Sequence, residues 1–429
     1  MSGSRKPKKI LITNIVTLNP GDAAILHGML HILRKKYGDD AEIIVFDRLS
    51  DVASKYYPWA SFRQSFFGNE PKGYLSKKLK KLGYGHWIRR FRYWKLRLAG
   101  IFHLFNIRIL SKLLVNKRDF ESLRIYLDSD LVVSTGGTYL IENYNLMPSI
   151  YDYKLTQALG IPLVFFTQSL GPFHKEKNKF SLKEIFNRSD CIFVRDERSK
   201  SNLLEIGVNA GKINLAKDAA FTINSESIED KQTSGSDSTL HIAVSVRSLR
   251  FFGGESGRIY ENYKNCIRAM VISAVREFDA KVTFLSTCQG IPEYWTNDGG
   301  LAEEVFLSLP ADIKSNVVVD TNFRQPLEIV SAYGRFDLVI ATRMHSAILS
   351  MVAGTPVLGV AYEFKLEELF DQLSMDQALI SIEHMTEESS IGALRSMVEG
   401  LGEWKSLVLK NRSICQAGAN SVIAKLPDL

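Results

Sequence analysis

The stretch "RFDLVIATRMHSAILSMVAGTPVLGVAYEFK", residues 335–365, holds the pattern that decides the fold. The short run 337–341 is mostly apolar and is typical of a strand buried on both faces of a sheet. Apolar residues then recur at helical spacing from Met344, and Gly354 ends that pattern. The next apolar run, 357–361, is again typical of a strand. We therefore predict a β-α-β unit, which builds parallel sheets.

The turn between this strand and this helix carries Arg343 and His345. In open α/β folds such a turn lies at the carboxyl end of the sheet, where ligands bind. The N-terminus of a helix offers N–H groups to an anion, and the planar guanidinium of Arg343 suits a phosphate or a carboxylate. The turn therefore predicts an anion site that contains a titratable histidine. The alternative is that His345 only forms a hydrogen bond in the first turn of the helix.

Strand and helix patterns alternate in both halves of the chain, which indicates parallel sheets covered by helices. The further predicted strands are 9–15, 42–47, 131–134, 162–167, 191–194, 240–246, 281–286 and 317–320. The polar segment 226–239 is rich in Ser and Asp and is typical of a linker. We predict an α/β protein with two doubly wound, Rossmann-like domains facing a cleft, which is the GT-B plan. The predicted domains are 1–225 and 240–429, with an insertion at 71–118.

Polar residues and glycines follow several of these strands. Gly21 permits a tight turn, and Asp22 is either the N-cap of the next helix or a group that holds or deprotonates a substrate hydroxyl. Arg247 follows the strand 240–246. The candidates behind the strands 131–134 and 162–167 are Gly136, Gly137, Tyr139, Glu142, Asn143 and Gln168. Each could be a capping or surface residue, but their common position at the carboxyl edge of a sheet predicts a shared site.

The positive charge of the chain is concentrated in residues 71–118. This segment has no Asp or Glu and holds 14 of the 54 Lys and Arg residues, which leaves 40 against 47 acidic residues elsewhere. Aromatic residues are interleaved with the cations, a combination suited to an anionic membrane surface. We assign membrane contact to Arg89, Arg90, Arg92, Lys95 and Arg97. Nucleic acid is the less favoured partner because no nucleic-acid-binding motif accompanies the segment, and a solvated basic hairpin is the plain alternative.

The remaining composition is that of a globular protein, with 45% hydrophobic and 24% charged residues. The four cysteines, Cys191, Cys266, Cys288 and Cys415, are widely spaced and predict neither a disulfide framework nor a zinc site. No cleavable signal region is recognisable, and the ten-residue uncharged run 98–107 is too short to cross a bilayer. We expect a cytoplasmic protein, peripheral on the inner face of the membrane, with no metal and no cofactor.

As an ordered set, the motifs resemble the polysaccharide pyruvyl transferase family. The matching segments are "NPGDAAIL", "STGGTYL", "TQSLGPF", "VRDERS", "LSTCQGI" and "TRMHSAILSMVAGTPVLGVAYEFK". "LSTCQGI" makes the chain look closest to pyruvyl transferases of colanic-acid-type exopolysaccharide pathways. The first motif departs from the pattern, because Asn19 and Pro20 precede Gly21 where relatives often have an extra small residue.

The resemblance implies transfer of a pyruvyl group from phosphoenolpyruvate to a sugar, as a cyclic ketal, with the acceptor lipid-linked. The donor carries a phosphate and a carboxylate, and we assign its binding to Arg343, Arg247, Ser346 and Lys365 in the C-terminal domain. His345 is the expected acid and Asp22, or less favourably Glu142, the base. The other candidates of the N-terminal domain are assigned to the acceptor. The alternatives are a GT-B glycosyltransferase that uses a nucleotide sugar and a non-catalytic, membrane-associated assembly factor.

Overall fold

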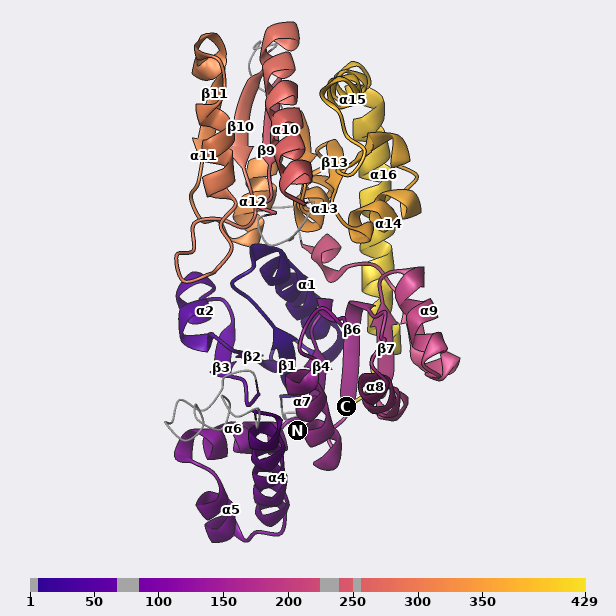
Figure 1. The fold of residues 1–429 in the computed structure, drawn as a ribbon. Coiled ribbons are helices and arrows are strands. Elements are labelled where there is room, and N and C mark those ends of the chain that lie inside the picture. The colour runs from indigo at the N-terminus through magenta and orange to yellow at the C-terminus, as the bar shows by residue number, and fades with distance from the viewer. Residues whose placement is uncertain (1–6, 68–84, 224–238, 250–255) are drawn as a thin grey trace, which may run out of the picture. The chain divides into compact units, whose positions relative to one another are not determined.

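The computed structural model describes residues 7–67, 85–223, 239–249 and 256–429 of the chain. The chain divides into two compact units (Figure 1). The first unit comprises the residues up to 18, 28–219 and 418–429, and the second comprises 19–27 and 220–417.

The first unit is built on a parallel sheet. Its strands are β1 (Lys9–Ile15), β2 (Glu42–Asp47), β3 (Ser61–Gln64), β4 (Leu131–Ser134), β5 (Gly137–Leu140), β6 (Leu163–Leu170), β7 (Cys191–Val194) and β8 (Ile213–Leu215). They lie in the order β3-β2-β1-β4-β6-β7-β8, and β5 pairs with β6. Strands β4, β6 and β7 are buried along their whole length, as a parallel sheet covered by helices requires.

The second unit has a parallel sheet of the same kind. Its strands are β9 (His241–Ser245), β10 (Lys281–Leu285), β11 (Val317–Asp320), β12 (Leu338–Ala341), β13 (Val357–Ala361) and β14 (Leu379–Ser381). They lie in the order β11-β10-β9-β12-β13-β14. Strands β12 and β13, which come from the stretch 335–365, are buried along their whole length.

Helices follow the strands in both halves of the chain. In the N-terminal half they are α1 (Pro20–Tyr37), α2 (Ser50–Tyr56), α4 (Gly85–Leu104), α5 (Arg108–Leu114), α6 (Lys117–Leu127), α7 (Met147–Ala158), α8 (Glu176–Arg188) and α9 (Glu197–Glu205). In the C-terminal half they are α10 (Ser256–Phe278), α11 (Gly299–Leu307), α12 (Pro326–Tyr333), α13 (Met344–Ala353), α14 (Phe364–Gln372), α15 (Glu387–Glu399) and α16 (Leu401–Asn420).

The strand order reverses once in each sheet, beside the first strand of the unit. Strand β1 lies between β2 and β4, and β9 lies between β10 and β12. In doubly wound sheets the ligand binds outside the carboxyl ends of the strands at such a reversal. Ser245 pairs with Ala341 at the ends of β9 and β12. The segments that leave these two strands, which carry Arg247 and Arg343, therefore start side by side.

The prediction of two doubly wound α/β domains is confirmed for each unit. The predicted bounds of β1, β2, β4, β7, β11 and β13 agree with the structure residue for residue. Of the two alternatives for Asp22, the helix cap is excluded, because α1 begins at Pro20. The Asn19 Oδ1 accepts a hydrogen bond of 3.1 Å from the Gly21 N–H, which places Asp22 inside the first turn.

The predicted domain bounds differ from the units at residues 19–27 and 220–223, which group with the second unit, and at the C-terminus. Residues 418–429, expected in the C-terminal domain, group with the first unit. Val422 and Leu426 are buried, and the Tyr37 Oη donates a hydrogen bond of 2.9 Å to the Pro427 carbonyl. Contacts of the last residues with α1 explain the grouping. The predicted linker 226–239, apart from its last residue, and positions 71–84 of the predicted insertion lie outside the described residues.

Candidate functional site

Strands β9 and β12 bring two partly buried arginines to the point where the second sheet reverses. Arg247 lies two residues beyond β9, and Arg343 is the residue immediately before α13. The Thr342 N–H donates a hydrogen bond of 3.0 Å to the Ser245 carbonyl, which fixes the two strand ends to each other. Arg247 and Arg343, the two cations that the sequence predicts to bind the donor, therefore both follow strand ends that lie side by side.

Arg343 is held by a carboxylate that the sequence analysis missed. Its Nε and Nη2 both donate to Asp298, the second over 3.1 Å, and Asp298 is fully buried. Burial alone would lower the pKa of Arg343, but the carboxylate of Asp298 outweighs burial and raises it, so the guanidinium stays charged. Asp298 also accepts a hydrogen bond of 3.0 Å from the Ser248 N–H. The pair thus fixes the orientation of Arg343 and ties it to the segment after β9.

Arg247 lies in a second group of charges and aromatic rings. Its guanidinium carbon is 4.0 Å from the centre of the Tyr362 ring, and its Nη1 is 3.7 Å from Glu363. Glu363 also accepts from the Tyr362 Oη and is 3.2 Å from the Lys365 Nζ. Burial and the neighbouring Arg343 lower the pKa of Arg247 to about 10. The structure therefore brings Arg247 and Lys365 together around one carboxylate.

A layer of hydroxyl groups lies beneath the two arginines. The Tyr263 Oη is 2.8 Å from the Thr342 Oγ1 and accepts a hydrogen bond of 3.1 Å from the Arg247 N–H. The Ser346 Oγ is 2.7 Å from the Ser245 Oγ and 3.2 Å from the Thr287 Oγ1. Ser346, predicted to bind the donor, is fully buried. Its side chain therefore fastens α13 to the sheet and is not exposed to a ligand.

His345 occupies the first turn of α13, two residues after Arg343, and is partly buried. The N-terminal turn of a helix carries a partial positive charge, which favours an anion beside the imidazole. Asp22 lies in the first turn of α1 and is 8% exposed. The acid and base roles of these two residues stay predictions.

The predicted acceptor residues of the first unit fall into two groups. Gln168 is fully buried, and its Nε2 donates to the Ser134 Oγ over 2.7 Å, so its side chain does not face solvent. The backbone explains this placement, because Thr167 has a φ of 38° and β6 shifts register between Phe165 and Gln168. Gly136 is likewise buried.

In the second group, Tyr139 and Glu142 are partly exposed and Asn143 is exposed, whereas Gly137 is buried. Tyr139 accepts a hydrogen bond of 3.3 Å from the Val16 N–H, and Asn143 is exposed. Gly137 has a φ of 104°, which suits glycine. Glu142 bonds Asn178 over 3.0 Å and pairs with Lys175 over 3.3 Å. Burial raises its pKa, but these partners outweigh burial and lower it, which makes Glu142 a poor base.

A network of buried polar groups lies in the first unit, and the sequence pattern did not reveal its role. Arg195 pairs with Asp218 and donates to Ser169 and Thr138, each over 2.8 Å. Asp196 is the N-cap of α9. It therefore caps a helix, which is the structural role that any polar residue directly after a strand could have. These contacts connect the segments around positions 138, 169, 195 and 218 within one unit, so we assign them a structural role.

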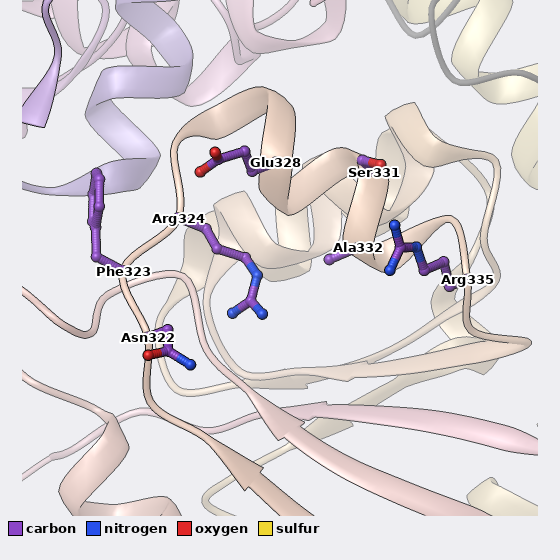
Figure 2. A pocket seen from close by; sticks show the side chains of 7 residues that line it. All are labelled: Asn322, Phe323, Arg324, Glu328, Ser331, Ala332 and Arg335. Atoms are coloured by element: carbon purple, nitrogen blue, oxygen red, sulfur yellow. The ribbon is translucent and has the colours of Figure 1, made fainter.

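A cavity of about 410 Å³ lies beside α12 and is separate from the residues above (Figure 2). Its lining residues are Asn322, Phe323, Arg324, Glu328, Ser331, Ala332 and Arg335. Arg324 pairs with Asp320, the last residue of β11, so its charge is compensated. None of the sequence-predicted site residues lines this cavity.

Neither a membrane-spanning helix nor a metal-ligand cluster occurs within the part of the chain that the structure describes. No described helix is long and apolar enough to cross a membrane. The described residues likewise hold no group of three or more His, Cys, Asp or Glu side chains placed to bind a metal.

The two parallel-sheet domains define a GT-B-like α/β protein, and solved structures share this fold. One is Anabaena Alr3699/HepE in complex with UDP-glucose, with 13% identity, a TM-score of 0.56, and coverage of 97% of this chain and 98% of that chain. Another is S. aureus MnaA with UDP, with 11% identity, a TM-score of 0.56, and coverage of 97% and 95%. At these identities the likeness shows the fold alone.

A family model described as polysaccharide pyruvyl transferase matches residues 19–363. The chain therefore belongs to the polysaccharide pyruvyl transferase family, and the resemblance seen in its motifs is confirmed. It is also 25% identical over 415 residues to the amylovoran biosynthesis protein AmsJ of Erwinia amylovora, covering 94% of this chain and 95% of that protein. The matched region includes Asp22, Arg247, Arg343 and His345.

Proposed function

We propose that the protein transfers a pyruvyl group from phosphoenolpyruvate to a sugar of a polysaccharide repeat unit, in exopolysaccharide or capsule biosynthesis. The observation that carries the proposal is the pair Arg247 and Arg343 at the reversal of the second sheet, beside the N-terminus of α13. Phosphoenolpyruvate presents a phosphate and a carboxylate on one small skeleton. Two partly buried guanidinium groups and a helix N-terminus match that distribution of charge.

The proposed reaction converts one enol ester and two hydroxyl groups into a ketal and inorganic phosphate. His345 protonates the methylene carbon of the donor, which becomes the methyl group and leaves C2 an oxocarbenium-like electrophile. One sugar hydroxyl attacks C2, the C2–O bond to phosphate breaks, and the second hydroxyl closes the ring. Of the two hydroxyl protons released, one replaces the proton that His345 gave and the other leaves with phosphate. Asp22 is the proposed base for the hydroxyl groups.

The arginines stabilise charge rather than move protons. The pairing with Asp298 keeps Arg343 charged and oriented, so its remaining N–H groups are available to the donor. Arg247 and Lys365 share Glu363, and a donor anion would take the place of that carboxylate. We propose that the acceptor is lipid-linked and that the protein works at an anionic membrane surface, without a metal or a cofactor.

The decisive experiment supplies the purified protein with phosphoenolpyruvate and a pool of lipid-linked oligosaccharides and weighs the products. The expected gain is one pyruvyl ketal, released together with phosphate. A gain of one hexose from an added nucleotide sugar would support the alternative of a glycosyltransferase and overturn the proposal.

The His345→Ala variant tests the assignment of the acid within that reaction. Loss of a general acid lowers turnover by about 10²–10⁴ while donor affinity changes little. The matched control is His384→Ala, a histidine of the same unit that lies beyond β14. A variant that loses donor affinity and keeps turnover at saturation would make His345 a ligand of the phosphate instead.

A further inference from the structure

Only one side of helix α4 packs against the rest of the first unit. Leu96 and Ala99 on this side are buried, and Tyr93 stacks on Tyr151 of α7 with ring centres 5.4 Å apart. A Cβ added at Gly100 would lie 2.5 Å from the Leu159 Cδ2, so the helix backbone approaches this part of the core closely. The helix is therefore anchored, and its opposite side keeps a fixed orientation.

The opposite side of α4 exposes large apolar residues at helical spacing. Trp87, Phe91, Trp94 and Leu98 recur every three or four residues, and each has more than 40% of its surface exposed. The exposed set continues through the turn into α5 as Leu104, Phe105, Ile107, Ile109, Leu110 and Leu113. We call these ten residues the apolar face. A soluble protein seldom exposes so many large apolar side chains on two consecutive helices.

Cations flank the aromatic residues of this face. Arg90 lies 5.4 Å from the centre of the Trp87 ring, Lys95 lies 5.5 Å from that of Phe91, and Arg97 lies 5.1 Å from that of Trp94. These contacts hold each positive charge beside an exposed ring. Arg92 differs, since its Nη2 donates to both oxygens of Asp119 over 2.8 and 3.1 Å. The prediction that Arg92 contacts a membrane is therefore not favoured by its surroundings.

We infer that the apolar face inserts into the interface of an anionic lipid bilayer, with α4 lying along the membrane plane. Apolar rings and aliphatic chains beside Lys and Arg are the composition of helices that lie in this layer. Pairing with a second copy is disfavoured, because it would bring together two segments that have no acidic residue between positions 71 and 118. Nucleic acid would leave the exposed Ile and Leu side chains without an apolar partner. The inference rests on the membrane association in the proposed function, which it assigns to this surface, and it does not depend on the transfer of the pyruvyl group.

The test measures binding of the full chain to vesicles of phosphatidylcholine, alone or mixed with an equal amount of phosphatidylglycerol. The apolar variant carries Phe91→Gln, Leu98→Gln and Ile109→Gln, and its control carries Phe180→Gln, Leu307→Gln and Val318→Gln at exposed apolar positions elsewhere. The charge variant carries Arg90→Gln, Lys95→Gln and Arg97→Gln. Its control carries Lys177→Gln, Lys405→Gln and Lys410→Gln, which are exposed on other helices.

The parent and both controls are expected to bind only the mixed vesicles and to release them as salt rises. Both the apolar and the charge variants are expected to bind at least about ten-fold less. Quenching of tryptophan fluorescence by brominated lipid should be strong in the parent and weak after Trp87→Phe and Trp94→Phe. Two results would overturn the inference: equal binding by the apolar variant and its control, or a dimer in solution that the apolar variant alone dissociates.

Discussion

Two donor groups of Arg343 form hydrogen bonds with Asp298. A substitution at position 343 therefore affects the stability of the fold as well as the binding of the donor. A lysine presents a single point charge and cannot match the two-pronged contact with a carboxylate. Asp298 would then be buried with an incomplete partner, so the variant loses stability as well as a donor ligand. The sequence pattern gives no sign of this loss of stability, because Asp298 lies in the irregular segment "YWTNDGG" and belongs to no recognisable motif.

We predict that Arg343→Lys weakens phosphoenolpyruvate binding by about 1.5–3 kcal/mol, the usual scale for a hydrogen bond to a charged group. Titration calorimetry measures the affinity, and thermal unfolding measures the accompanying loss of stability. The matched control is Arg324→Lys, which makes the same chemical change in the Arg324–Asp320 pair, outside the site. Unchanged donor affinity in the Arg343 variant would remove this residue from the site.

Glu363 is the carboxylate that competes with the donor in our proposal. It accepts from Tyr362 and lies near Arg247 and Lys365. We predict that Glu363→Gln strengthens binding of phosphoenolpyruvate several-fold, because the substitution removes a negative charge beside two cations. The gain should shrink as salt is added. Glu367→Gln, one helical turn further along α14, is the control and should leave the affinity unchanged. Weaker binding in the Glu363 variant would show that this carboxylate orients the cations instead.

At the scale of the element, the sequence predicted strands wherever an apolar run is short and bounded by polar residues. Strands β2, β4 and β13 agree with prediction for this reason. Strands β3, β8 and β14 were missed because each has only three or four residues and lies at or near the edge of its sheet, where burial imposes little pattern. Strand β6 runs three residues past its predicted end, because the positive φ of Thr167 lets the strand continue after a shift in register.

The end of α13 is a second case in which sequence and structure agree. Gly354 has a φ of 79° and ends the helix, as its position in the motif predicts. A Cβ at this position would lie 3.1 Å from the Leu409 Cδ2. We predict that Gly354→Ala lowers the free energy of unfolding by about 1 kcal/mol or more.

The control for this prediction is Gly392→Ala, in the interior of α15. A Cβ there would have no atom within 4 Å, and alanine favours a helix, so this variant should be more stable by about 0.5–1 kcal/mol. Thermal unfolding of the two variants should therefore shift in opposite directions. A shift in the same direction would show that backbone conformation does not decide the outcome at position 354.

At the scale of the whole molecule, the sequence predicted two doubly wound domains. It did not predict the buried hydrogen bonds between polar side chains that connect strands and helices within a domain. Asp152 on α7 accepts hydrogen bonds from Thr13 at β1 and, over 2.9 Å, from Tyr126 of α6. Nothing in the helical pattern of α7 marks Asp152, because one polar residue on a buried face cannot be told from an exposed one without the fold. The cations of the candidate site could be predicted because they directly follow predicted strands. The partners of Asp152 could not be predicted, because they are far from it in the sequence.

Asp152 should make the stability of the first unit depend on pH. Burial raises its pKa to about 6, although Thr13 and Tyr126 act in the opposite direction. The folded state then binds more protons than the unfolded state between about pH 4 and 6, so this stabilisation is lost as pH rises through that window. We predict that Asp152→Asn gains stability relative to the parent across the window, by up to roughly 3 kcal/mol. Melting temperatures measured at intervals from pH 4 to 7 test this, and a constant difference would contradict it.

The return of residues 418–429 to the first unit has a consequence for how the protein is made. The chain is synthesised from its N-terminus, so the β1–β8 sheet emerges from the ribosome well before Val422 and Leu426, which are buried and belong to the same unit. The surface of α1 that bonds Pro427 stays uncovered while residues 220–417 of the second unit are being translated. The first domain to be synthesised is therefore the last to be completed, and during that interval it depends on chaperones or on its own partial stability to avoid aggregation.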